Sequence, residues 1–82
     1  MNQVQQCDVS YSYNGATQQG RLHIEEKKDG AQSRFRAVID NSPLHGTYGG
    51  YAESVELALD FLNLAMQAEG ADEITFSCQE AT

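Results

Sequence analysis

Lysine and arginine are absent from the whole second half of this chain. Between Ala37 and Thr82 there is no basic residue, whereas eight acidic residues lie there. All five basic residues precede Ala37, and only four acidic residues accompany them. The net charge of −7 is therefore carried by the second half. Such an asymmetry says little about the fold, but it decides which partners can approach which side of the molecule.

Cysteine, proline and long apolar runs are also scarce. Two cysteines are too few for a disulfide-dense secreted scaffold, so Cys7 and Cys78 are expected to be reduced, buried thiols. The first six residues are polar and uncharged, unlike a signal peptide, and the most apolar stretch, 55–68, is too short and too polar to cross a membrane. We therefore expect a soluble, cytoplasmic protein with one domain spanning residues 1–82.

The motifs of common catalytic and cofactor sites are missing. The chain has no phosphate loop, dinucleotide fingerprint or nucleophile elbow. His23 and His45 are far apart, and neither has a cysteine or a second histidine at metal-ligand spacing. We therefore predict no catalytic residue, no metal site and no cofactor, and we expect a protein that is not an enzyme.

The first part of the chain, residues 3–40, has the pattern of a three-stranded meander. Val9, Tyr11 and Tyr13 alternate with serines, which is the period of a strand. The pair Asn14-Gly15 follows and predicts a two-residue hairpin, in which Cys7 lies opposite Leu22. In this register Cys7, Val9, Tyr11 and Tyr13 and the residues opposite them all lie on one apolar face of the sheet.

A second hairpin is expected to turn through residues 27–30, a four-residue loop that ends in glycine. In this register Leu22 lies opposite Phe35, and His23 lies opposite Arg34. The other sheet face is then polar with a modest basic centre, and Arg21 lies between Asp8 and Arg36. This face is either an ordinary solvated surface or a docking surface for an acidic partner or a nucleic-acid backbone.

The second part of the chain predicts a loop, a helix and a strand. Glycines and a proline mark 41–52 as a loop, and the tyrosines and histidine within it are typical of a binding loop, with His45, Tyr48 and Tyr51 as its candidate contacts. A helix is expected over 53–69, closed by Gly70, and a strand over 73–79. The predicted fold is a two-layer α+β domain of order β-β-β-α-β, with its last strand parallel to its third.

The acidic residues of this second part are predicted to form a partner-binding stripe. Glu53, Glu56 and Asp60 fall on one narrow arc of the helix, and Asp72 and Glu73 follow it. Such a stripe either keeps a small protein soluble or occupies a basic groove that normally holds nucleic acid. We expect a protein partner with a basic surface, and we do not favour direct binding of nucleic acid.

The apolar arc of the helix is about twice as wide as the stripe of about 100° that a surface helix needs. One sheet face cannot cover all of it, which leaves Leu57, Phe61 and Leu64 in need of a second cover. The glycine-rich loop or a second copy of the chain could supply that cover. We prefer the interpretation that a second copy covers them, so these three residues are the candidate interface of a homodimer.

Two resemblances suggest functional classes. A short, acidic, mixed α+β chain without a catalytic motif resembles anti-CRISPR and anti-restriction inhibitors in overall character, which implies a module that blocks a partner's nucleic-acid-binding surface. Locally, the segment from Phe35 to Ala65, which contains FRAVID, HGTYGGY and AESVELAL, resembles the core of HicB-type antitoxin domains. The family's proline-glycine close is replaced by Ser42-Pro43-Leu44. We also expect no room for a C-terminal DNA-binding segment, so the resemblance does not imply operator binding, whereas it is compatible with neutralising a partner by protein contact. A third class, RNA binding across the open sheet face, is the least favoured, and its candidate contacts are Arg21, Arg34, Arg36 and His23.

Overall fold

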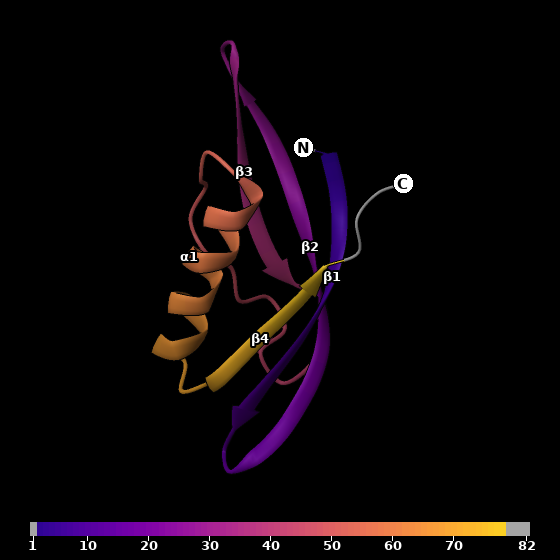
Figure 1. Cartoon of the computed structure of the whole chain (residues 1–82), viewed down its shortest axis with the longest axis vertical. Helices are drawn as coiled ribbons and strands as arrows, with labels where there is room; N and C mark the ends of the chain where they lie inside the picture. The colour runs from indigo at the N-terminus through magenta and orange to yellow at the C-terminus, as the bar shows by residue number, and fades with distance from the viewer. Residues whose placement is uncertain (1, 79–82) are drawn as a thin grey trace.

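The chain folds into a four-stranded antiparallel sheet with one helix on one face. The computed structural model describes residues 2–78, with the side chains of residues 5–78. In chain order the elements are β1 (Asn2–Tyr13), β2 (Ala16–Asp29), β3 (Gln32–Ile39), α1 (Val55–Ala68) and β4 (Asp72–Cys78). The strands lie side by side in the order β3-β2-β1-β4, as Figure 1 shows. This confirms the predicted α+β class and element order, while the last predicted strand residue, 79, lies outside the described residues.

The first hairpin matches its prediction in every pair. Asn14 and Gly15 form the turn with φ values of 53° and 78°, the left-handed conformation that a two-residue hairpin of this type requires. Cys7 lies opposite Leu22, as predicted, and Tyr13 lies opposite Ala16. The sequence pattern therefore determined which face of these two strands is buried.

The second hairpin has a different register from the predicted one. Its loop is the pair Gly30-Ala31, not residues 27–30, and Leu22 lies opposite Ile39 rather than Phe35. Gly30 has a φ of 66° at the first loop position, where a type II′ turn needs glycine. The shift is an even number of residues, so the same side chains face the core. It is favourable because Ile24 now lies opposite Ala37 instead of Ser33, while Leu22 keeps an apolar partner.

The loop after β3 explains why β4 runs in an unpredicted direction. Residues 47–52 double back along β3, with hydrogen bonds from the Ala52 N–H to the Phe35 carbonyl (2.7 Å) and from the Ile39 N–H to the Thr47 carbonyl (2.9 Å). The helix therefore starts beside the beginning of β3 instead of its end. As a result β4 is antiparallel to β1 and to β3, and the predicted parallel arrangement with β3 is wrong.

The helix is bounded by local signals at both ends, inside the predicted range of 53–69. Ser54 is the N-cap, and its hydroxyl accepts a hydrogen bond from the Leu57 N–H (3.1 Å). At the other end the Gly70 N–H donates to the Gln67 carbonyl and the Ala71 N–H to the Met66 carbonyl, both at 3.0 Å. This pair of bonds is the Schellman motif that the predicted glycine close implies.

The core lies between α1 and the apolar face of the sheet. The helix contributes Ala58, Leu62 and Met66, which are fully buried, and it packs against β3 and β4. Each fully buried leucine or methionine contributes roughly 1.5–3 kcal/mol of transfer free energy. The sheet contributes the rest, chiefly Val9, Tyr11, Leu22, Ile24, Ala37 and Ile39. The buried Tyr11 hydroxyl is satisfied by the Ser42 hydroxyl at 2.7 Å.

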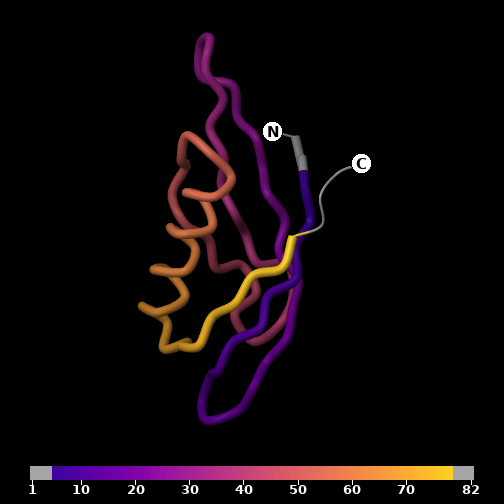
Figure 2. Tube along the Cα trace, viewed as in Figure 1, coloured from indigo at the N-terminus to yellow at the C-terminus, as the bar shows by residue number. Residues whose placement is uncertain are grey.

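The molecule is a thin plate, with extents of 44 × 28 × 17 Å. The β1–β2 turn and the β2–β3 turn lie at its opposite ends, as Figure 2 shows. The helix covers only the middle of this length, so both hairpin tips extend beyond it (Figure 1).

The two cysteines are not free thiols, which corrects the sequence prediction. Cys7 of β1 and Cys78 of β4 face each other across the sheet and form a disulfide. The prediction placed both side chains correctly toward the core, where Cys7 is 3% exposed. It missed their pairing because the position of the last strand beside β1 could not be inferred from the chain.

Candidate functional site

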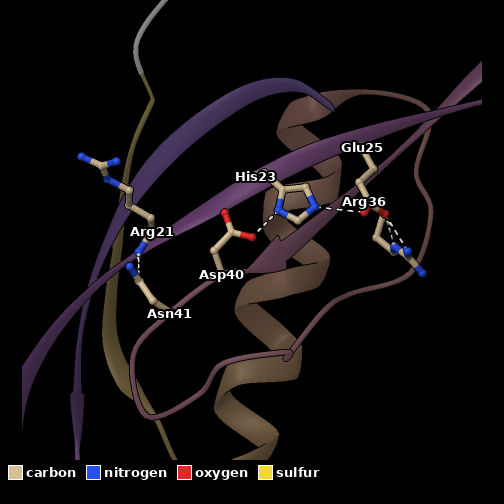
Figure 3. A network of polar contacts seen from close by, with 6 residues as sticks. All are labelled: Arg21, His23, Glu25, Arg36, Asp40 and Asn41. Atoms are coloured by element: carbon tan, nitrogen blue, oxygen red, sulfur yellow. Dashed lines mark hydrogen bonds and ion pairs between the residues drawn. The ribbon is translucent and has the colours of Figure 1, made fainter. Parts of the chain in front are cut away.

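A chain of charged side chains crosses the sheet face opposite the helix. His23 of β2 lies between two carboxylates, with Nδ1 facing Asp40 and Nε2 at 2.9 Å from Glu25 Oε2. Arg36 of β3 donates to the other oxygen of Glu25, from Nε at 3.1 Å and from Nη2 at 2.6 Å. Figure 3 shows these four side chains, together with the Arg21 N–H that donates to Asn41 Oδ1 (2.7 Å). We call His23, Glu25, Arg36 and Asp40 the outer-face network.

The register shift in the second hairpin created this network. Glu25 lies directly opposite Arg36, and His23 lies opposite Val38 instead of the predicted Arg34. The predicted pairing of Arg21 with Asp8 is confirmed, with Arg21 Nε 3.7 Å from Asp8 Oδ1, whereas its predicted pairing with Arg36 is wrong. The sequence placed these residues on the correct face but gave them the wrong partners.

The network changes the protonation of its members. Burial disfavours the His23 cation, but hydrogen bonds to Glu25 and Asp40 and the charges of both carboxylates outweigh burial and raise the pKa of His23 above 6.5. The hydrogen bond from His23, then that from Arg36, lowers the pKa of Glu25 below 4.5. Each ring nitrogen needs a proton to bond to a carboxylate, so the geometry favours the imidazolium form.

Stability is therefore expected to depend on pH through His23. Because its pKa is raised on folding, its contribution is fully present below pH 6.5 and is lost as the pH rises through the raised value. We expect the difference in melting temperature between the wild type and His23→Gln to shrink as the pH rises from 6 to 9. The exposed His45→Gln is the matched control, because this histidine lies outside the outer-face network. A constant difference for His23→Gln would contradict the prediction.

The predicted binding-loop residues divide between two places. Tyr48 and Tyr51 flank Arg36, whose Cζ lies 4.9 Å from the centroid of each ring, and Lys27 Nζ lies 5.3 Å from that of Tyr51. His45 is exposed and lines an open cleft of about 510 Å³ between the loop and α1, together with Tyr48 and Glu69. The sequence did not predict tyrosines beside Arg36, because their placement depends on the return path of the loop along β3.

The predicted acidic stripe lies on the surface in two groups. Glu53, Glu56 and Asp60 are all exposed around the first half of α1, and Asp72 and Glu73 are exposed at the start of β4. At a rise of 1.5 Å per residue, about 12 Å of helix separates Asp60 from the last helical residue. The second group therefore extends the acidic surface beyond the end of α1 and does not fill the spaces between the helix charges.

Every basic side chain of the chain has a partner. Arg21 pairs with Asp8, Lys28 with Glu26 at 3.5 Å, Arg34 with Glu53 at 3.7 Å and Arg36 with Glu25, while Lys27 lies over the ring of Tyr51. Within the described range, by contrast, several exposed acids have no ion-pair partner: Asp29, Glu56, Asp60, Glu69, Asp72 and Glu73. The uncompensated charge of the surface is therefore negative, and it gathers on α1 and the start of β4.

The candidate dimer residues differ in how far the chain itself covers them. Phe61 is half-buried, because Gly49 of the loop packs directly on its backbone. Leu57 is 38% exposed and Leu64 is 62% exposed. The glycine-rich loop thus covers one of the three residues, and the homodimer stays a prediction.

The described residues show neither a metal-binding cluster nor a membrane-spanning helix. Over residues 2–78, no cluster of three or more histidine, cysteine, aspartate or glutamate side chains is arranged to hold a metal ion. The single helix in that range is neither long nor apolar enough to cross a membrane. Comparison with known proteins adds no relative, since no protein-family model, curated protein or solved structure matches this chain.

Proposed function

We propose that this chain is a non-enzymatic protein-binding module whose acidic surface contacts a basic surface of a partner protein. The acidic surface comprises Glu53, Glu56, Asp60, Asp72 and Glu73, all of which are exposed. The observation that carries the proposal is the imbalance of pairing. Each basic residue is engaged within the fold, whereas four of these five acids have no ion-pair partner in the described residues, and Glu53 is 78% exposed despite its contact with Arg34.

The proposal extends to the kind of basic surface. An acidic stripe that competes with nucleic acid would make this chain an inhibitor of the anti-CRISPR or anti-restriction type. Glu56 and Asp60 are separated by about 6 Å of helix axis, and Glu53 precedes the N-cap Ser54, whereas a DNA strand carries one charge per about 3.4 Å. The negative charges of the first group, Glu53, Glu56 and Asp60, are therefore more widely spaced than the phosphates of a DNA strand. The inhibitor role therefore needs the second acidic group, Asp72 and Glu73, in contact with the same partner.

Two other classes are weighed against this one. A HicB-like antitoxin or a small regulatory domain would also act by protein contact, and it differs in its partner rather than in its surface. RNA binding across the sheet gains support from Tyr48 and Tyr51, which supply the aromatic rings that such a face needs. Other contacts weaken the RNA-binding hypothesis more than the tyrosines support it, because Arg36 and Arg21 are already paired with Glu25 and Asp8. Protein binding remains the better-supported function.

The compartment is part of the proposal. A cytoplasmic location stays a prediction, and the disulfide between Cys7 and Cys78 weighs against it. Disulfides persist in oxidising compartments and are rare in cytosolic proteins. A partner in an oxidising compartment is therefore a better starting point for a search than a cytosolic one.

Neutralising Glu53, Glu56 and Asp60 is expected to weaken binding of the partner at least tenfold. The variant is Glu53→Gln, Glu56→Gln and Asp60→Asn, and the partner is first captured from a lysate on immobilised wild-type protein and then purified. The three changes remove the charges that attract a basic surface while keeping side-chain size, so circular dichroism should be unchanged. The affinity of the purified partner is then measured by titration calorimetry at two salt concentrations, since screening should weaken wild-type binding.

The matched control carries the same net charge at other exposed positions. Gln6→Lys, Thr17→Lys and Gln19→Lys also raise the charge by three, but these exposed residues lie on β1 and β2, on the sheet face opposite α1. This control should bind within a factor of about three of the wild type. It changes the net charge as much as the first variant does, but it keeps the negative charges of Glu53, Glu56 and Asp60. Equal losses in the two variants, or a captured partner that is nucleic acid, would refute the proposed function.

A further inference from the structure

The two edge strands of the sheet, β3 and β4, differ in the backbone hydrogen bonding of their outer edges. The outer edge of β3 is covered by the returning loop, which forms backbone hydrogen bonds at both of its ends, through Ala52 and through Thr47. The outer edge of β4 has no such cover. Among residues 2–78, the backbone of β4 is paired with β1 alone, so its outward N–H and C=O groups have no partner in the described fold. An open edge of this kind is a template for a further strand.

The residues of β4 make most of this edge suitable for pairing. The protective features are confined to its start, where Asp72 and Glu73 are charged and a register shift occurs opposite Tyr11. Glu73 has a φ of 49°, which marks the bulge. From Ile74 to Cys78 the strand has no charge and no proline. Pairing with β1 and the bond from Cys78 to Cys7 hold this segment in place, so a partner would not need to order it.

The negative charge around the outer edge of β4 favours pairing with a basic segment. Asp72 and Glu73 are exposed and have no ion-pair partner in the described residues, and each copy of the chain carries a net charge of −7. Pairing of two copies would therefore bring like charges together, whereas a basic segment would be attracted. We propose that β4 adds an extended segment of the partner, with lysine or arginine beside Asp72 and Glu73, as a further strand of the sheet. This inference rests on the proposed function, because it takes the partner to be basic.

Such a complex would use two kinds of interaction. Main-chain hydrogen bonds along 74–78 would provide binding that depends on an extended backbone, as in other cases of strand addition. The half-buried Ile74 and Phe76 would gain cover from apolar side chains at alternate positions of the partner. The recognised segment would then alternate basic or polar residues with apolar ones.

Two synthetic peptides of equal charge test this inference. The first repeats Lys-Val and can form a strand. The second carries the same number of lysines in repeats of Lys-Pro-Pro and cannot pair, because proline lacks the N–H and here falls on both edges of the extended peptide. Each is added to the isotope-labelled wild-type protein, and backbone amide exchange is followed residue by residue by NMR. We expect the Lys-Val peptide to slow exchange at least tenfold at outward-facing amides within 74–78. The Lys-Pro-Pro peptide should leave those amides unchanged.

The outcomes separate this inference from the proposed function. If both peptides perturb only α1, the strand-addition proposal is overturned and the acidic surface is retained as a binding site. If neither peptide binds at low salt, the proposed function is refuted as well. A third comparison uses Glu53→Gln, Glu56→Gln and Asp60→Asn, in which the Lys-Val peptide should still slow exchange within 74–78. Loss of that protection would place the binding on the helix and overturn the edge proposal.

Discussion

Replacing Cys7 and Cys78 together by alanine is expected to lower the free energy of unfolding by about 2–5 kcal/mol. The bond joins residues that are 71 positions apart, so it restricts nearly the whole unfolded chain. In the chain-entropy description the effect grows with the length of the closed loop, and a loop of this size lies near the upper part of that range. Alanine is preferred to serine, because Cys7 is 3% exposed and a hydroxyl there would be buried.

The loss should be large relative to the total stability. Small domains are stable by roughly 5–15 kcal/mol, and a chain of 82 residues belongs near the lower end. For a domain of this size, each kcal/mol changes the melting temperature by about 4–8 °C. Urea titration with and without dithiothreitol provides the measurement. Reductant should lower the wild-type midpoint to that of the double variant and leave the variant unchanged. A wild-type midpoint that does not respond, with two free thiols by mass spectrometry, would contradict this prediction.

Adding one methyl group at Gly49 is expected to destabilise the fold by about 2–3 kcal/mol, through overpacking. A Cβ at this position would lie 2.6 Å from the Phe61 carbonyl carbon and 2.7 Å from the Leu62 nitrogen. Both are backbone atoms of α1, which cannot rotate away as a side chain can. Gly49 does not have a left-handed φ, so the expected cost arises from the contact with the helix and not from backbone strain.

The neighbouring Gly50→Ala is the control for this prediction. A Cβ there would meet only Phe61 Cδ2, at 4.0 Å, which is an ordinary contact. That variant should be neutral or up to about 1 kcal/mol more stable, because alanine restricts the unfolded chain more than glycine does. Chemical denaturation of the two variants measures the difference. Equal stability of Gly49→Ala and Gly50→Ala would mean that the loop does not pack on the helix as described.

The sequence predicted the parts of the fold that local patterns specify. Alternation and the Asn14-Gly15 turn gave the first register without error, and Gly70 gave the end of the helix. The second register was missed because Gly30 can close either a four-residue loop or a two-residue loop, and both keep the same side chains inside. The two loops differ in which residues lie opposite each other, such as Ile39 rather than Phe35 opposite Leu22, and that depends on contacts between strands.

The other missed parts share one origin, the path of residues 40–54. The loop returns along β3 through a few backbone hydrogen bonds that no side-chain pattern indicates. Its path determines the direction of β4, the meeting of Cys7 with Cys78 and the position of Tyr48 and Tyr51 beside Arg36. The candidate acids lie at the surface as predicted, and for Glu56 and Asp60 this exposure follows from the period of the helix.

The bond between Cys7 and Cys78 makes the chain between them a closed covalent ring. A single cleavage within that ring, for example at the exposed tip formed by Gly30 and Ala31, opens the ring without releasing a fragment. The two resulting pieces stay joined through β1 and β4, which are also neighbours in the sheet. A cut hairpin tip would therefore leave the acidic surface attached to the rest of the molecule, and reduction would be needed to separate them.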